Sequence, residues 1–271
     1  MTQDTWLMKH PYLCEIAALH ELVGITVESA PMPPLIVPLL DDYTGEFHAG
    51  VPLLHSSAVK IDVRPAGKAF ATFVEVLSAK PLPDKLAFEV HALVAALQSD
   101  ADFPCRAIAW LLKNDSFTPE QPGLLLFLGW TVMARYLEPL VAAFAQWRDE
   151  EHWLRRYCPM CGASPAMGLI VHGEPASLRF LSCGFCRTRW RYPRTRCAFC
   201  DSQDDQEISV LSIAGEDALR IAYCEACEGY LKTYSGKSSE RFFLADWTSI
   251  HLDVIAQDRG LKRYAGSRYQ L

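Results

Sequence analysis

The chain has 271 residues, half of them hydrophobic, and a formal net charge of −6 at pH 7. This length can bury one good core and carry a small additional module, and the negative charge argues against a general role in binding nucleic acid. The longest apolar stretch, residues 123–134, is too short to span a bilayer, and the N-terminus lacks the features of a signal peptide. We therefore expect a soluble protein of the reducing cytoplasm.

Residues 1–156 are predicted to form a helical bundle. A short first helix carries apolar residues on one stripe over residues 13–20, and a proline-rich connection without regular structure follows over residues 31–52. Apolar residues with the i, i+3, i+4, i+7 spacing of an amphipathic helix then predict helices over residues 70–77 and 86–97.

Prolines mark the last two helices of this part. Asp102 is expected to cap a short helix over residues 104–112, whose first proline lies where a helix tolerates it. The final helix is predicted to begin within residues 118–122 and to continue to about residue 153. Pro139 must kink or break it, because an interior proline removes one hydrogen bond and costs about 3 kcal/mol.

Eight of the ten cysteines form four Cys-x-x-Cys pairs. The pairs are Cys158/Cys161, Cys183/Cys186, Cys197/Cys200 and Cys224/Cys227. The first two pairs are separated by 21 residues and the last two by 23, enough for a strand, a loop and a returning strand, whereas the 10 residues between the middle pairs suit a linker. Because a tetrahedral sulfur site needs two such turns, the spacing predicts two consecutive four-cysteine metal ribbons, residues 157–196 and 197–240.

Both ribbons repeat one pattern, in which a β-rich segment leads into the second cysteine pair. Units this small bury too little apolar surface to fold alone, so a bound metal would supply folding energy. Four disulfides in a secreted scaffold are an alternative, but nothing in the chain looks secretory. A thioredoxin-type redox pair is also disfavoured, since there are four pairs and no βαβ setting. The other two cysteines, Cys14 and Cys105, stand alone in helical patterns and are expected to be packed in the core.

After the ribbons, residues 242–259 predict a final helix that ends at Gly260, within a C-terminal helix and tail of residues 241–271. One side of this helix carries Trp247, His251, Val254 and Ile255. The expected fold class is therefore α+β: an N-terminal helical bundle, two tandem metal modules and a C-terminal helix.

No pattern typical of catalysis is present. His20, His91 and His251 lie in helical stretches, where a histidine is more often structural than a ligand. His152 lies shortly before Cys158, but four cysteines already fill the metal site expected there. The sequence has no glycine-rich phosphate loop and no nucleophile elbow, so we predict no enzymatic activity.

The two ribbons differ in charge. The first has six arginines against Glu174 alone, whereas Cys197 to Tyr234 of the second has two basic residues against eight acidic ones. Part of the arginine excess balances thiolates, but a basic stretch over residues 187–196 remains. Basic and aromatic side chains together can bind nucleic acid, yet they also dominate protein interfaces, and the acidic second ribbon favours a protein partner. Arg187, Trp190 and Tyr192 are the predicted partner contacts.

Four segments identify a family resemblance. YCPMCGASP, LRFLSCGFCRTRW, TRCAFC and YCEACEGYLK, in this order behind a helical region, resemble the FdhE family of formate dehydrogenase accessory proteins. The resemblance is specific over about residues 156–234 and looser through the final helix. The N-terminal region, which includes PPLIVPLL, resembles the family in its general character rather than in sharp motifs. A further leading helical segment of the family is expected to be absent.

The resemblance implies a cytoplasmic, non-catalytic maturation factor that binds the catalytic subunit of respiratory, molybdopterin-dependent formate dehydrogenase before export. The family's metal ligands carry over onto all eight paired cysteines, four for each site. The family implies rubredoxin-like iron, whereas the cysteine count alone suits zinc ribbons equally well. Iron would permit a redox role, because tetrathiolate iron changes oxidation state and zinc does not.

Two other functions remain as alternatives. A zinc-ribbon nucleic-acid-binding protein would use the arginines of residues 187–194 around Trp190, and its binding would weaken steeply with salt. An electron-transfer enzyme is disfavoured because the sequence has no flavin or nicotinamide motif.

Overall fold

The computed structural model describes residues 2–113, 115–174, 176–236 and 239–269, and residues 270 and 271 of the expected tail lie outside them. The chain forms two compact units, each assembled from separate segments. The unit that we call the sheet unit comprises Met1–Cys14, Tyr43–Ser56 and Arg148–Ser267, and the helical unit comprises Glu15–Asp42, Ser57–Trp147 and Arg268–Leu271. Parts of the expected N-terminal bundle therefore belong to the same unit as the cysteines.

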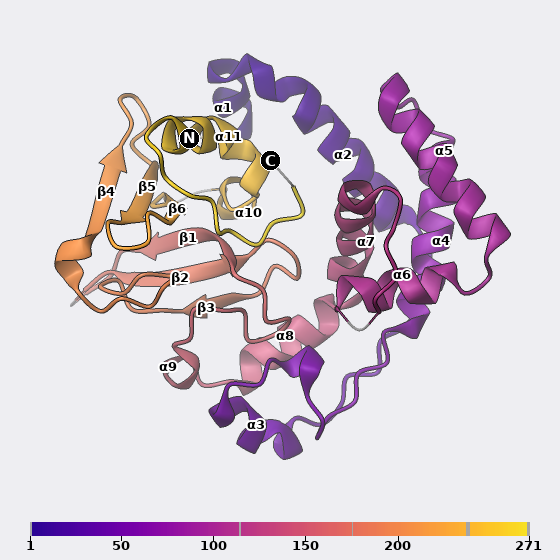
Figure 1. Ribbon diagram of the computed structural model, residues 1–271, viewed down its shortest axis with the longest axis horizontal. Coiled ribbons are helices and arrows are strands. Elements are labelled where there is room, and N and C mark those ends of the chain that lie inside the picture. The colour runs from indigo at the N-terminus through magenta and orange to yellow at the C-terminus, as the bar shows by residue number, and fades with distance from the viewer. Residues whose placement is uncertain (1, 114, 175, 237–238, 270–271) are drawn as a thin grey trace. The chain divides into compact units, whose positions relative to one another are not determined.

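Six helices account for most of the helical unit (Figure 1). They are α2 (Cys14–Ser29), α4 (Arg64–Ser78), α5 (Asp84–Ser99), α6 (Phe103–Leu111), α7 (Pro122–Tyr136) and α8 (Glu138–Trp147). Helix α4 is central and packs against α5, α6 and α7. Its predicted apolar face is confirmed, because Phe70, Phe73, Val74 and Leu77 are all buried. Helix α5 buries less of its expected face, namely Val90 and Leu93.

The break at Pro139 is confirmed. Helices α7 and α8 are bent by 58° relative to each other, and the proline takes the second position of α8, where a missing N–H breaks no helical bond. No single helix in the described residues is long and apolar enough to cross a membrane, although the bent pair α7 and α8 together has the required length and composition. Helix α7 is largely buried, as expected for a core helix.

Two smaller expectations for the helices are wrong. Cys14, at the start of α2, and Cys105, on α6, are both exposed rather than packed. Helix α6 buries the face opposite Cys105, with Ala107, Ile108 and Leu111. Asp102 stands at the N-cap position of α6, but its side chain makes no capping bond because its backbone is already helical.

The two cysteine ribbons join into one six-stranded sheet with the order β3-β2-β1-β6-β5-β4 (Figure 1). The strands are β1 (Pro165–Val171), β2 (Leu178–Cys183), β3 (Arg189–Arg191), β4 (Ile208–Ser212), β5 (Leu219–Cys224) and β6 (Tyr230–Tyr234). Neighbours within each ribbon are antiparallel, whereas β1 and β6 pair in parallel across the ribbons. This central pairing covers two strand edges that separate ribbons would leave open. Gly168 permits it, because a Cβ there would lie 2.8 Å from Thr233 Oγ1.

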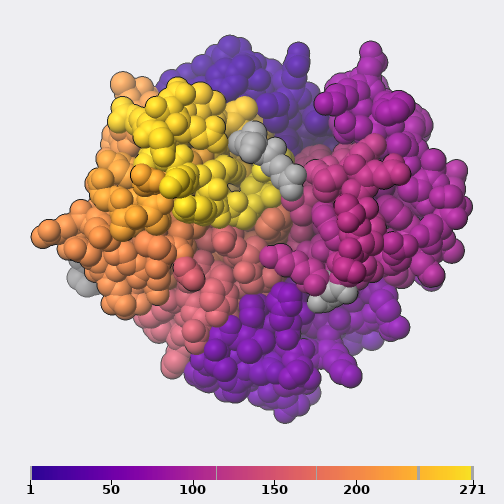
Figure 2. Space-filling view, viewed as in Figure 1, coloured from indigo at the N-terminus to yellow at the C-terminus, as the bar shows by residue number. Residues whose placement is uncertain are grey.

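Five short helices complete the sheet unit. They are α1 (Gln3–Lys9), α3 (Thr44–Ala49), α9 (Glu150–Trp153), α10 (Glu240–Phe243) and α11 (Ile250–Asp258). Helix α11 packs against β5 and β6. In Figure 2 the yellow C-terminal residues lie against the orange residues of the sheet unit.

The single final helix predicted over residues 242–259 is wrong. The structure breaks it into α10, a 3-10 turn (Asp246–Ser249) and α11. The break has a physical cause, because Lys232 Nζ donates to the carbonyl oxygens of Asp246 at 2.8 Å and Ser249 at 3.4 Å, which a continuous helix would use internally. Val254, expected on the inner side, is 58% exposed.

A buried network of charges fixes this C-terminal segment to β6. Lys232 is only 1% exposed, and its ammonium lies 2.7 Å from carboxylate oxygens of both Asp246 and Asp253. Arg263 pairs with the same two aspartates, and Tyr230 donates to Asp253 Oδ1 at 2.7 Å. Two positive and two negative groups therefore balance inside the unit, which is the condition for burying charge without a large penalty.

Candidate metal centres

All four Cys-x-x-Cys pairs adopt the same turn. In each, the backbone N–H of the first cysteine donates to the carbonyl oxygen five residues later, at 2.8–3.0 Å. The residue after each second cysteine has a left-handed backbone, with φ of 76°, 63°, 63° and 59° at Gly162, Arg187, Asp201 and Glu228. A left-handed residue reverses the chain, so that both sulfur atoms of a pair face the same side.

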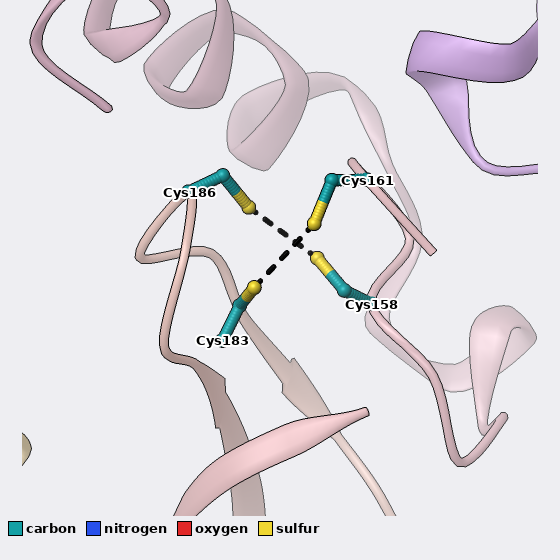
Figure 3. A group of neighbouring side chains, drawn as sticks. All are labelled: Cys158, Cys161, Cys183 and Cys186. Carbon is teal, nitrogen blue, oxygen red and sulfur yellow. Dashed lines mark hydrogen bonds between the residues drawn. The ribbon is translucent and has the colours of Figure 1, made fainter. Parts of the chain in front are cut away.

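The first and second pairs meet to form the first site, shown in Figure 3. The four sulfur atoms point to one centre, and the crossing distances are 3.4 Å for Cys158 Sγ to Cys186 Sγ and 3.5 Å for Cys161 Sγ to Cys183 Sγ. A tetrahedral ion with metal–sulfur bonds of about 2.3 Å separates its ligands by about 3.8 Å. The cluster is therefore slightly contracted but of the right size for one metal ion.

The third and fourth pairs form the second site in the same way. Here Cys197 Sγ lies 3.7 Å from Cys227 Sγ, and Cys200 Sγ lies 3.8 Å from Cys224 Sγ. These separations match the edge of about 3.8 Å expected for a tetrahedral tetrathiolate site. The pairing of neighbouring turns thus follows the residue spacing in the sequence.

The sulfur geometry favours metal binding over disulfides. A disulfide holds its sulfur atoms about 2.05 Å apart in pairs, whereas here four sulfurs share one centre. Backbone N–H groups also donate to sulfur, from Phe185 to Cys183 at 3.4 Å and from Phe199 to Cys197 at 3.3 Å. Such donors stabilise a thiolate ligand. Gly184, next to Cys183, lies close to the carbonyl oxygen of Gly266, because a Cβ at this position would lie only 2.5 Å from that oxygen.

The thiols of the first site differ in acidity. Burial raises the pKa of Cys158 well above its ordinary value, and hydrogen bonds with the neighbouring sulfurs raise the pKa of Cys161. Burial would also raise the pKa of Cys186, but hydrogen bonds with the other three thiols and with Thr188 bring it well below its ordinary value. A metal ion must therefore displace protons from buried thiols, so metal affinity should fall at acid pH.

The first site is enclosed by two segments far from it in sequence. The 3-10 turn Leu53–His55 lies against the first cysteine turn, where the backbone N–H of Leu53 donates to Pro159 and that of Leu54 to Met160, both at 2.9 Å. On the other side, Gly266 lies against Gly184 and the backbone of Ser164. No pattern in the sequence indicates this enclosure, because the first segment precedes the cysteines by about a hundred residues.

The second site is more open than the first, since Cys200 is exposed and Cys227 is only partly buried. We therefore expect a chelator to remove the two metal ions at different rates, with the faster loss from the second site. Time-resolved metal release to a coloured chelator would show two phases of equal amplitude. A Cys224→Ser variant should lack the fast phase, whereas a single phase in the wild type would contradict the expectation.

A buried arginine of β2 lies beside the second site. Arg179 donates to the carbonyl oxygen of Arg196 at 2.6 Å and lies over the Tyr192 ring. The Tyr192 hydroxyl lies 2.9 Å from the carbonyl oxygen of Cys197 and 2.6 Å from Asp201 Oδ1, within the third cysteine turn. Burial lowers the pKa of Arg179 to about 10, which still leaves it charged at neutral pH. It supplies positive charge beside the thiolates of the second site.

The structure places two of the three predicted partner contacts inside the protein. Trp190 is 0% and Tyr192 is 1% exposed, and the Trp190 indole donates to the carbonyl oxygen of Arg155 at 2.7 Å. This burial corrects the expectation of a surface contact for both rings. Their alternation with arginines reflects a strand with one buried face. Arg187 is exposed, and its contact with a partner stays a prediction.

The basic stretch is also less free than its sequence indicates. Arg189 pairs with Glu240 at 2.6 Å, and Arg191 pairs with Glu151. A nucleic-acid interface would need aromatic rings for stacking and unpaired cations. With the two rings buried and two arginines paired, this stretch does not favour the nucleic-acid alternative.

The chain is similar to FdhE proteins. A family model described as "FdhE, central domain" matches residues 157–194. An FdhE homolog of Aquifex aeolicus is 33% identical over 130 residues, which are 46% of this chain and 46% of that protein. An FdhE homolog of Stutzerimonas stutzeri is 29% identical over 244 residues, 86% of this chain and 75% of that protein. FdhE of Salmonella newport is 27% identical over 192 residues, 64% of this chain and 62% of that protein.

A crystal structure of FdhE from Pseudomonas aeruginosa has the same fold, with a TM-score of 0.57 and 22% sequence identity. The match covers 96% of this chain and 89% of that chain, so it includes both the helices and the cysteine-bearing sheet. In contrast, the chain spans about half the length of the Aquifex aeolicus relative.

Proposed function

Because the chain belongs to the FdhE family, we propose that it is a non-catalytic accessory protein for formate dehydrogenase that holds two metal ions in its cysteine clusters. The observation that carries this proposal is the pair of four-cysteine groups built on one continuous sheet. The family resemblance extends the proposal to the catalytic subunit of the respiratory, molybdopterin-dependent enzyme, which the chain would bind in the cytoplasm before export.

The eight cysteines of the two clusters are the proposed ligands. Four thiolates per site satisfy a tetrahedral ion completely, so neither site keeps an open position for a substrate. This donor set fits a structural or electron-transfer centre rather than a hydrolytic one, in agreement with a non-catalytic role.

Iron and zinc would give the sites different chemistry. Tetrathiolate iron exchanges one electron at a site, whereas zinc has no redox chemistry and makes the sheet a rigid docking surface. Iron is favoured by the family resemblance and is the metal that a redox role requires. Metal analysis of protein purified without oxygen, together with its visible spectrum, decides between them: colour that bleaches on reduction supports iron, and a colourless protein with two zinc ions removes the redox role.

The second site is more accessible to a partner than the first, because Cys200 is exposed. An acidic residue follows each of its two cysteine turns directly, Asp201 and Glu228, the latter paired with Lys262. We propose that the catalytic subunit contacts this end of the sheet with a basic surface.

The direct test is co-purification of the formate dehydrogenase catalytic subunit with the tagged full chain. The wild type should retain the subunit, and Cys224→Ser should retain less of it. Cys105→Ser, a change at an exposed cysteine outside both clusters, is the matched control. If the wild type recovers no subunit at any salt concentration, the proposed partnership is wrong.

A further inference from the structure

Three metal-ligating side chains lie together outside the cysteine clusters. They are His10 at the end of α1, Glu216 in the loop between β4 and β5, and His251 in the first turn of α11. His10 Nε2 lies 3.5 Å from Glu216 Oε1, and His251 Nε2 lies 2.7 Å from the same oxygen. One ligand atom from each residue lies within 4.8 Å of the others. We call this the His-Glu-His cluster.

The cluster is screened from water. His10 is 8% and Glu216 is 6% exposed, and His251 is partly buried. The Trp6 ring covers one side, with its centroid 4.0 Å from that of His10, and the two imidazole rings lie 4.7 Å apart. A carboxylate in such a dry position needs a compensating positive charge or several donors.

The hydrogen bonds of His10 leave one ring nitrogen unused. The Tyr12 hydroxyl lies 3.0 Å from His10 Nδ1 and fixes the ring, so that Nε2 faces Glu216. Among the described residues, His10 Nε2 has no hydrogen-bond partner. A buried polar atom left in this state costs about 1–3 kcal/mol. Proteins orient the histidine ligands of metals in the same way: one ring nitrogen is held by a hydrogen bond, and the other points at the metal.

We propose that His10, Glu216 and His251 bind one divalent transition-metal cation, in a third site of the protein. Two imidazoles and one carboxylate form a ligand set that zinc and non-haem ferrous iron both accept. Metal–ligand bonds of about 2.1 Å separate neighbouring ligand atoms by about 3.0–3.4 Å. The two His–Glu separations, 2.7 and 3.5 Å, lie on either side of this range, and all three ligand atoms lie within 4.8 Å of one another. Three protein ligands leave a coordination position for water, unlike the closed cysteine sites.

The alternative is a hydrogen-bonded triad without metal. In that case Glu216 would accept from His251 Nε2, which lies 2.9 Å from its second oxygen, and His10 would only stack on the other ring. The two arrangements differ in a measurable way. The triad binds no additional cation, whereas the metal site takes up one cation per chain after both cysteine clusters are full.

The test uses the full chain without a histidine tag, with both cysteine clusters first filled with zinc, and titrates it with cobalt(II). We expect one further equivalent, with the weak visible bands of cobalt bound to nitrogen and oxygen and without thiolate charge-transfer bands. Glu216→Gln and His251→Asn should weaken this binding at least about tenfold, since even outer partners of metal ligands typically contribute 10–100-fold. His91→Asn, at an exposed helical histidine, is the matched control and should bind as the wild type does.

The wild-type titration decides the question even if a variant folds poorly. The proposal would be overturned if the wild type bound no further equivalent of cobalt. It would also be overturned if thiolate charge-transfer bands showed that cobalt only replaces zinc in the cysteine clusters. Binding that survives unchanged in Glu216→Gln, or that is lost equally in His91→Asn, would also overturn it. Circular dichroism and zinc content of each variant identify those that keep the fold.

Discussion

Replacing Cys186 with serine is expected to remove one of the two metal ions and to lower the thermal stability of the sheet unit sharply. The side chain is buried in the first site, where it meets three other sulfurs and the Thr188 hydroxyl. Structural zinc sites contribute about 10–16 kcal/mol of apparent binding free energy, and a mesophilic domain has only about 5–15 kcal/mol of net stability. Losing even a third of the metal contribution should lower Tm by more than about 10 °C.

Metal content by mass spectrometry and Tm by circular dichroism measure both effects. Cys105→Ser is the control, because it makes the same chemical change at an exposed cysteine of α6. It should keep two metal ions and an unchanged Tm. A Cys186→Ser protein with both metal ions and the wild-type Tm would show that the first site does not hold the fold together.

The cysteine sites were predictable because their determinants are local. Each turn is set by a Cys-x-x-Cys pair and the next one or two residues, and the distance between pairs selects which turns meet. The same holds for the face of α4 and for the break at Pro139, where periodicity and one missing N–H decide the outcome.

Features that local patterns do not indicate depend on contacts between distant segments. The parallel pairing of β1 with β6 joins residues more than sixty positions apart, and its one local sign, Gly168, is equally consistent with a bulge. Trp190 and Tyr192, predicted as partner contacts, are instead buried, because β3 (Arg189–Arg191) and the residue that follows it are too short a stretch to show which face is buried. Likewise, the helical spacing of apolar residues over residues 242–259 cannot show that Lys232 binds two carbonyl oxygens that the expected helix would use.

The second large effect is expected for Lys232→Met. This change keeps most of the side-chain volume but leaves Asp246 and Asp253, both almost fully buried, with Arg263 as their only remaining cationic partner among the described residues. Removing one member of a buried ion pair typically destabilises a protein by about 3–5 kcal/mol. Chemical denaturation should show this loss. Lys262→Met is the matched control, since its pair with Glu228 is exposed and should contribute less than about 1 kcal/mol.

The pH dependence provides a second readout of the same network. Burial alone would raise the pKa of Asp246, but Lys232 and Arg263 lower it below its ordinary value of 3.8. The resulting stability is present above pH 3.8 and is lost as pH falls through the lower folded value. Without the Lys232 ammonium, the pKa of Asp246 should rise, so acid unfolding should begin at higher pH in Lys232→Met than in the wild type. Identical acid transitions would show that Lys232 does not control this carboxylate.

The network should also protect the first metal site, because it holds the segment that ends beside Gly184. Ser267 is hydrogen-bonded to Asp246, and Gly266 next to it contacts the second cysteine turn. Loosening the segment in Lys232→Met should therefore accelerate chelation of the slowly released metal ion and leave the fast phase unchanged. Equal acceleration of both phases would indicate general unfolding instead, and an unchanged slow phase would mean that this segment does not cover the site.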